Sequence, residues 1–261
     1  MDESERINRI YDPEKAHEYR TVLDAAYYNT YHGRVMTHLL KEICRSFAKE
    51  RLDVLELGCG TGRYFSCLDN VGSITGVDIS RSMIEQAHRR VEEEHYPADV
   101  CLECGDINTW RIPQEKFDLI YSIGTLGEYC RLSPPIVNKV MSGLKEGGCF
   151  LFTVFDANHD LSSRARSLAV RGPMQRITAR TYHQMPEGLK RPFGRTFFSY
   201  FLSRSELLRM LGPMAHHHPS VVRLSCDDES WTGTHLIVMM HRPPAPYESR
   251  KTILETAVTI R

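Results

Sequence analysis

The sequence has no excess of charge of either sign, since 33 lysine and arginine residues balance 33 aspartate and glutamate residues. A protein that coats nucleic acid through phosphate contacts usually carries a clear positive excess, so nucleic acid is not expected as a partner. The sequence also lacks any run of roughly eighteen consecutive apolar residues, the length that a membrane-spanning helix needs. The charged start MDESERINRIYDPEK has no apolar run typical of a secretory signal. We therefore expect a cytoplasmic chain with no membrane partner.

The sequence also contains few cysteine and histidine spacings that are typical of metal sites. The single C-x-x-C pair, Cys101 and Cys104, lies inside a predicted strand, and neither a second pair nor a spaced histidine pair accompanies it. We therefore predict no zinc site and interpret these cysteines as buried free thiols on opposite strand faces. The three histidines at 216–218 follow Gly212-Pro213 and are interpreted as a polar loop. No metal is expected.

What the sequence does contain is a glycine-rich loop, in the segment VLELGCGTGRY over residues 54–64. An apolar strand with Glu56 near its end breaks into three glycines at alternate positions, and we expect a helix over 61–68. The glycines are Gly58, Gly60 and Gly62. Glycine accepts positive φ and lets a ligand lie against the backbone. The dinucleotide fingerprint has a different spacing, G-x-G-x-x-G, and the Glu56 carboxylate would repel a pyrophosphate. A ligand with an amino group and a sulfonium fits better.

Further acids follow the glycine loop at the ends of predicted strands. Asp78 ends the second strand about twenty residues past the first, the position at which a ribose diol is held in nucleotide-binding α/β folds. Asp106 follows the third strand, and Ser122 and Gly124 lie at the end of the fourth. The fifth strand follows a turn at Gly147-Gly148.

These motifs, in this order and at this spacing, resemble those of the class I S-adenosylmethionine-dependent methyltransferases over about residues 52–156. The resemblance implies an α/β, Rossmann-like fold: a seven-stranded, mostly parallel sheet in order 3-2-1-4-5-7-6 with helices on both faces. It also implies S-adenosyl-L-methionine as the cofactor. The implied cofactor-binding residues are Glu56, Gly58, Gly60, Gly62, Asp78, Ile79, Met83, Asp106, Ile107, Ser122 and Gly124. Among them, Asp106 would accept from the adenine amino group, and the ring would lie between Ile107 on one side and Ile79 or Met83 on the other.

The pattern of helices and strands divides the chain into three parts. Residues 1–50 are predicted to form an N-terminal helical lid, and residues 51–242 the methyltransferase core, with a substrate-cap insertion at about 157–200. Within 157–195, eight lysine and arginine residues face only two acids, and prolines and glycines make regular structure unfavourable. Residues 243–261 are interpreted as a tail beyond the fold.

The fourth-strand loop, Ser122-Ile123-Gly124-Thr125, lacks the Asn/Asp-Pro-Pro-Tyr/Phe sequence of enzymes that methylate nucleobases or glutamine amides. We therefore expect methyl transfer to an O, N or C nucleophile of a small metabolite. The candidate bases are His159, Glu128 and Tyr28, with further candidates in Tyr31, His32, Tyr129 and Asp156. Two alternatives stay open: a tRNA or peptide methyltransferase that docks through the arginine-rich segment, and a cofactor-binding protein without catalysis. A homodimer is also left open.

Overall fold

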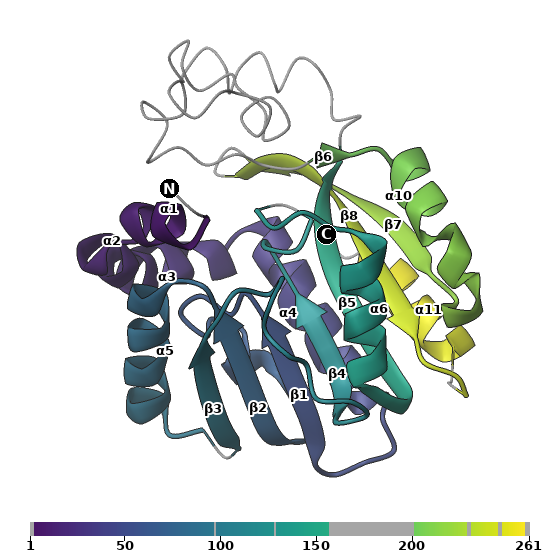
Figure 1. Cartoon of the computed structure of the whole chain (residues 1–261), viewed down its shortest axis with the longest axis horizontal. Coiled ribbons are helices and arrows are strands. Elements are labelled where there is room, and N and C mark those ends of the chain that lie inside the picture. Colours follow the sequence, from purple (N-terminus) through teal and green to yellow (C-terminus); the bar gives the residue numbers. More distant parts are fainter. Residues whose placement is uncertain are drawn as a thin grey trace.

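The computed structural model describes residues 3–96, 98–127, 129–156, 201–228, 231–244 and 247–258. Its sheet has the strand order β3-β2-β1-β4-β5-β8-β7, and a two-residue strand, β6, pairs with β5 (Figure 1). The strands are β1 (Leu52–Leu57), β2 (Val71–Asp78), β3 (Asp99–Cys104), β4 (Phe117–Ser122), β5 (Leu144–Asp156), β6 (Phe201–Leu202), β7 (Ser220–Asp228) and β8 (Trp231–His241). β1 to β5 pair in parallel, and β8 runs antiparallel to β5 and β7. The predicted order is therefore confirmed, with β7 and β8 as its last two strands.

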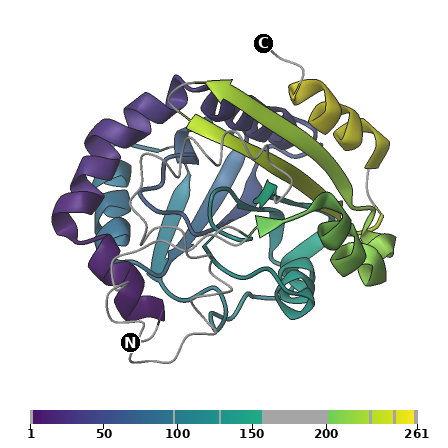
Figure 2. The same cartoon turned by 90° about the horizontal axis from the view of Figure 1, so that it is seen from above.

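Helices cover both faces of this sheet (Figures 1 and 2). The α-helices are α1 (Glu3–Ile10), α2 (Pro13–Glu18), α3 (Asp24–Tyr28), α4 (Tyr31–Arg45), α5 (Arg81–Glu94), α6 (Pro134–Gly143), α10 (Arg204–Leu211) and α11 (Tyr247–Ala257). A π-helical turn, Tyr19–Leu23, joins α2 to α3. Two helices begin at a capping side chain: Asp12 caps α2 ahead of Pro13, and Ser203 forms a capping box with Glu206 in α10. Within the described ranges, no helix has the length and apolar character to cross a bilayer.

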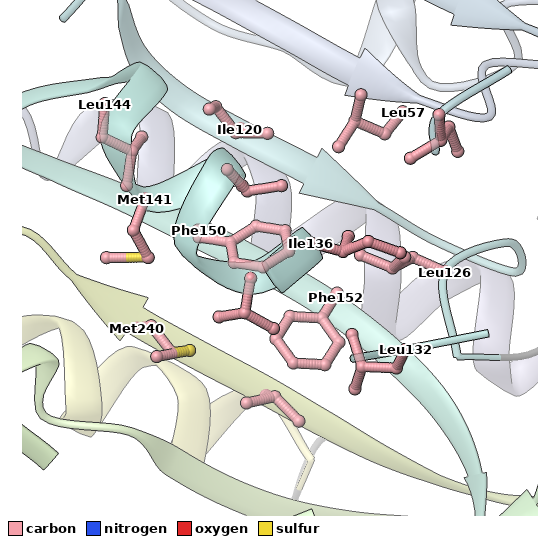
Figure 3. Packing of buried hydrophobic residues seen from close by; sticks show 14 of the residues in the cluster. Leu57, Ile120, Leu126, Leu132, Ile136, Met141, Leu144, Phe150, Phe152 and Met240 are labelled. Atoms are coloured by element: carbon pink, nitrogen blue, oxygen red, sulfur yellow. The ribbon is translucent and has the colours of Figure 1, made fainter. Parts of the chain in front are cut away.

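Alternate residues of the central strands divide the core between the two faces. On β5, Cys149 and Leu151 pack with α4 and α11, whereas Phe150 and Phe152 pack with α6 and α10 on the other face. Figure 3 shows this second cluster, in which the Phe150 and Phe152 rings stack with centroids 4.6 Å apart. A parallel sheet buried on both faces requires such apolar strands, and it fixes the loops at the carboxyl ends of the strands.

Three expectations need correction. The helix expected over 61–68 does not form: the positive-φ glycines close a turn in which the Gly62 N–H donates to the Cys59 carbonyl, and only a 3₁₀ turn, Phe65–Cys67, follows. The thiols of Cys101 and Cys104 are exposed, because β3 is the edge strand of the sheet. The histidines at 216 and 217 belong to a 3₁₀ turn, Gly212–His217, and not to an irregular loop.

The C-terminal segment also differs from its interpretation as a tail beyond the fold. Over Tyr247–Ala257 it forms α11, which packs on α4, β7 and β8. Leu254 and Ala257 are buried in the core there. The Arg250 guanidinium lies 3.8 Å from the centre of the Phe47 ring and donates to the Gly147 carbonyl at 2.7 Å. A buried arginine with these partners attaches the segment to the core.

Candidate functional site

The glycine loop connects the carboxyl end of β1 to the rest of the site. Its glycines Gly58, Gly60 and Gly62 all have positive φ, at 76°, 52° and 71°. A Cβ atom at Gly58 would lie 2.3 Å from the Thr125 side chain, so the position requires glycine. A Cβ atom at Gly60 would have no protein atom within 4 Å. The backbone at Gly60 therefore faces open space, as a cradle for a ligand would.

The Asp78 carboxylate lies directly beside this loop. Its two oxygens accept backbone N–H groups, from Gly60 at 2.9 Å and from Ser80 at 2.8 Å. Burial raises the pKa of this carboxyl, and the two N–H donors partly oppose that effect. Each carboxylate oxygen accepts more than one hydrogen bond, so Asp78 can hold the loop and also accept from a ligand hydroxyl.

Glu56 provides a second carboxylate at the end of β1. Only 2% of its surface is exposed, and its Oε2 accepts from the Tyr121 hydroxyl at 2.8 Å. Burial raises the pKa of Glu56 well above its usual range, although the Tyr121 hydrogen bond and the Arg63 charge act in the opposite direction. A cationic ligand group beside Glu56 would favour the ionised carboxylate and be stabilised by it.

Two adjoining cavities, of about 130 Å³ and about 230 Å³, lie at this edge of the sheet. Both are lined by Ile7 of α1 and by Asp78 and Ile79. The first also contacts the predicted residues Glu56, Gly58, Gly60, Met83 and Gly124, and the second contacts Gly58, Asp106 and Ile107. The structure thus brings together nine of the eleven predicted cofactor residues around two cavities, which share Asp78 and Ile79 and are also lined by the carboxylates Glu56 and Asp106. These residues fit a ligand that carries a cation, a diol and a flat ring.

The two remaining predicted residues have structural contacts. The Ser122 hydroxyl donates to the Leu57 carbonyl at 2.9 Å and accepts from the Leu126 N–H at 3.0 Å, so it joins the ends of β1 and β4. A Cβ atom at Gly62 would meet the Phe65 ring at 2.7 Å. Neither residue lines the two cavities.

None of the three predicted catalytic residues can be assigned to the two cavities. Glu128 and His159 lie outside the described residues. The Tyr28 hydroxyl donates to the Arg63 carbonyl, and its side chain packs in the cluster around α4. Tyr28 does not line either of the two cavities. The role of all three as a base stays a prediction.

A buried ionic cluster, which the sequence did not reveal, joins α3 to α5 and to the glycine loop. Asp24 of α3 is 1% exposed and accepts from Arg90 Nη2 at 2.5 Å and from the Thr61 hydroxyl. Arg63 Nε lies 3.1 Å from the other Asp24 oxygen, and its guanidinium lies 4.2 Å from the centre of the Tyr27 ring. Although burial acts against the charge, Asp24 helps to raise the pKa of Arg63 above its usual value. Arg63 therefore lines the first cavity as a fixed cation.

Two histidines also line the first cavity, His32 of α4 and His235 of β8. Both are buried, and their ring centroids are 4.6 Å apart. His32 Nδ1 bonds the Tyr27 hydroxyl, which in turn lies 2.6 Å from the Tyr64 hydroxyl. Burial lowers the pKa of His32 well below its usual value, and the charges of His235 and Arg63 act in the same direction. His235 was missed because it falls in a strand whose other residues indicate core. Among the described residues, no cluster of three or more metal-binding side chains occurs.

Residues 54–148 match a family model described as a methyltransferase domain. The chain is 36% identical over 124 residues to the malonyl-(acyl-carrier protein) O-methyltransferase of Priestia megaterium, a match that covers 46% of this chain and 43% of that protein. It is also 36% identical over 119 residues to the demethylmenaquinone methyltransferase of Leptospira interrogans, covering 44% of this chain and 47% of the relative. The chain thus matches less than half the length of these relatives.

Solved structures share the fold over a longer part of the chain. The phosphoethanolamine N-methyltransferase 2 of Haemonchus contortus, in complex with phosphomonomethylethanolamine and S-adenosylhomocysteine, has a TM-score of 0.65 at 14% identity, covering 93% of this chain and 61% of that one. A S-adenosylmethionine-dependent methyltransferase of Aquifex aeolicus has a TM-score of 0.53 at 13% identity, covering 88% and 98%. Residues 54–148 therefore belong to the methyltransferase-domain family, and the described sheet shares the fold of these solved methyltransferase structures.

Proposed function

We propose that this chain binds S-adenosyl-L-methionine and transfers its methyl group to an O, N or C nucleophile of a small metabolite. The observation that carries the proposal is the pairing of Glu56 and Asp78 around a glycine loop whose Gly60 faces open space. A dinucleotide site would not place a buried carboxylate at the end of its first strand, because the pyrophosphate would be repelled.

Each part of the cofactor has residues suited to hold it. Glu56 suits the amino group, and the Arg63 guanidinium suits the carboxylate, since both side chains line the first cavity. Asp78 suits the ribose diol, and each charge-assisted hydrogen bond there is worth roughly 1.5–3 kcal/mol. Ile79 and Ile107 provide apolar walls for the adenine, with Asp106 nearby. The cofactor supplies a methyl group that its sulfonium has already activated.

Because the methyl group arrives activated, the protein has mostly to orient the acceptor and exclude water. Orientation alone can lower the barrier by roughly 7–11 kcal/mol. The first cavity offers a suitable enclosure, because Tyr11, Tyr19, Tyr27 and Tyr129 contribute aromatic walls around it. Ile7 of α1 is buried and lines both cavities, which supports a role for the N-terminal helices as a lid.

A small acceptor is favoured over a nucleic acid by the neutral charge of the chain. The names of the matched relatives support the same conclusion, since they act on a malonyl group carried by a protein and on demethylmenaquinone. The alternative of a tRNA or peptide substrate depends on the arginine-rich segment 157–195, which lies outside the described residues.

Two measurements on the purified chain test this function. Isothermal titration calorimetry with S-adenosylmethionine should give saturable binding, and release of S-adenosylhomocysteine should rise when members of a metabolite library are added. Absence of cofactor binding would contradict the proposal. Binding without methyl transfer to any library member or to tRNA would favour the non-catalytic alternative, and transfer to tRNA alone would favour the nucleic-acid alternative.

A further inference from the structure

The first cavity holds two buried imidazole rings that cofactor binding does not need. His32 and His235 come from α4 and β8, which are more than half the chain apart in sequence, yet their ring centroids lie 4.6 Å apart. His235 pairs with Phe155 across β5 and β8, at the edge of the sheet where the β4 loop with Gly124 also lies. This edge is where ligands of open α/β sheets react.

The His32 ring is oriented by a chain of hydroxyl groups. Its Nδ1 bonds the Tyr27 hydroxyl, and the Tyr27 and Tyr64 hydroxyls lie 2.6 Å apart. When Nδ1–H donates to Tyr27, the lone pair of the neutral ring lies on Nε2. An imidazole that is held by a third group in this way has the arrangement of a general base.

Among the described residues, the charged and titratable groups near His32 are Tyr27 on α3, Arg63 and Tyr64 after the glycine loop, His235 on β8 and Glu56 on β1. Burial and the charges of His235 and Arg63 disfavour a positive charge on His32. Within the part of the chain that the structure describes, the carboxylates that line the first cavity are Glu56 and Asp78, and both suit the cofactor. The Arg63 charge would therefore repel an acceptor with an ammonium group, and neither carboxylate would be left to pair with it. An acceptor with a neutral hydroxyl has no such electrostatic penalty.

We propose that His32 takes the proton of a hydroxyl-bearing acceptor and that His235 is a positioning residue that holds the His32 ring. This proposal rests on the proposed methyl-transfer function. In the step, the acceptor O–H bond breaks and its proton passes to His32 Nε2, while the oxygen forms its bond to the methyl carbon and the carbon–sulfur electron pair stays on sulfur. The imidazolium then releases the proton to water. A carboxylate acceptor, which arrives ionised, would need no such base.

Kinetics on matched variants test the role of His32. Wild type, His32→Asn and a control on the same helix, His38→Asn, are assayed by S-adenosylhomocysteine release against three sets of probes: phenols and alcohols, amines, and carboxylic acids. Asparagine keeps an amide near the position of Nδ1, so the contact with Tyr27 can persist. We expect O-methylated products from the hydroxyl set and a loss of kcat of about 10²–10⁴-fold in His32→Asn. His38→Asn should stay within about twofold of wild type, as should cofactor affinity in both variants.

The pH dependence separates a base from a structural residue. Wild-type kcat should fall as pH falls through the His32 pKa, which lies below the usual 6.5. In His32→Asn, kcat should instead rise steadily with pH, as the acceptor hydroxyl itself ionises. His235→Asn should move the acid limb of the profile, because the pKa of His32 depends on its neighbour.

A readout without turnover is the ¹⁵N spectrum of histidine-labelled protein. We expect His32 to be neutral at pH 7, with its proton on Nδ1. An imidazolium at pH 7, or a proton on Nε2, would overturn the proposal. So would cofactor binding with methyl transfer only to amines or acids, or to no probe at all, or a His32→Asn variant with unchanged kcat. Failure of the chain to bind cofactor would instead contradict the proposed function itself.

Discussion

Replacing Glu56 with glutamine should have opposite effects on the stability of the free protein and on cofactor binding. Glutamine keeps the shape of the side chain and an oxygen that accepts from Tyr121, whose hydroxyl lies 2.8 Å from Glu56 Oε2. What the substitution removes is a negative charge on a side chain that is only 2% exposed. The free protein must remove this charge from water, whereas a cationic ligand group would compensate it.

The effect on stability follows from the raised pKa of Glu56. Burial is the main cause, and the Tyr121 hydrogen bond and Arg63 offset it only in part. Between the usual value of 4.5 and the raised pKa, the folded protein binds more protons than the unfolded chain, so stability falls as pH rises through that window. Above the window, Glu56→Gln should be more stable than wild type by at least about 1 kcal/mol. This corresponds to roughly 2–4 °C in the unfolding midpoint.

The effect on binding follows from the lost charge-assisted contact. Such a hydrogen bond is worth roughly 1.5–3 kcal/mol, so the Kd for S-adenosylhomocysteine should rise about 10- to 150-fold. Thermal unfolding without ligand and isothermal titration calorimetry measure the two effects on the same samples. Glu146→Gln is the matched control, because it makes the same charge change at an exposed position of β5. An unchanged Kd, or a lower midpoint at high pH than wild type, would refute the reasoning.

Three further substitutions test other parts of the structure. Gly60→Ala should keep the fold by circular dichroism, at a strain of about 1–2 kcal/mol, but weaken cofactor binding at least about tenfold; normal binding would mean that the loop is not the cradle. Asp24→Asn removes the carboxylate charge that pairs with Arg63 and Arg90. Because breaking a buried ion pair costs about 3–5 kcal/mol, this variant should have a lower unfolding midpoint and weaker cofactor binding; wild-type values in both assays would contradict this role. Leu254→Ala should destabilise the chain by about 2–5 kcal/mol in urea titration, whereas the exposed control Glu255→Ala should not; equal effects would mean that α11 is not part of the cooperative core.

The central strands were predictable because each is an apolar run that ends at a polar residue or glycine. Their order in the sheet was predicted from the resemblance to the class I methyltransferases, and the structure confirms it. The helix over 61–68 was predicted wrongly because the spacing of apolar residues gives no information about the turn that Gly58, Gly60 and Gly62 form with positive φ. The packing of α11 was missed because few of its residues are apolar, and its attachment depends on a long-range contact of Arg250 with Gly147 and Ser46.

The same division holds for the site. Asp78 and Glu56 were found because strand ends in a parallel sheet meet at one edge, so position along the chain predicts position in space. Asp24 and His235 were not found, because their positions in space depend on how α3 and β8 pack near the glycine loop. No spacing rule relates Asp24 to Arg63 and Arg90, and only the fold brings these three side chains into contact.

The central claim is that the carboxylate of Asp78 holds the ribose of S-adenosylmethionine. Calorimetric titration of S-adenosylmethionine into wild type, Asp78→Ala and the exposed control Asp99→Ala on β3 tests it most directly. The account predicts that Asp78→Ala weakens binding at least about tenfold, or about 1.4 kcal/mol, while Asp99→Ala binds as wild type does. An Asp78→Ala variant that is folded by circular dichroism and binds with unchanged affinity would contradict it.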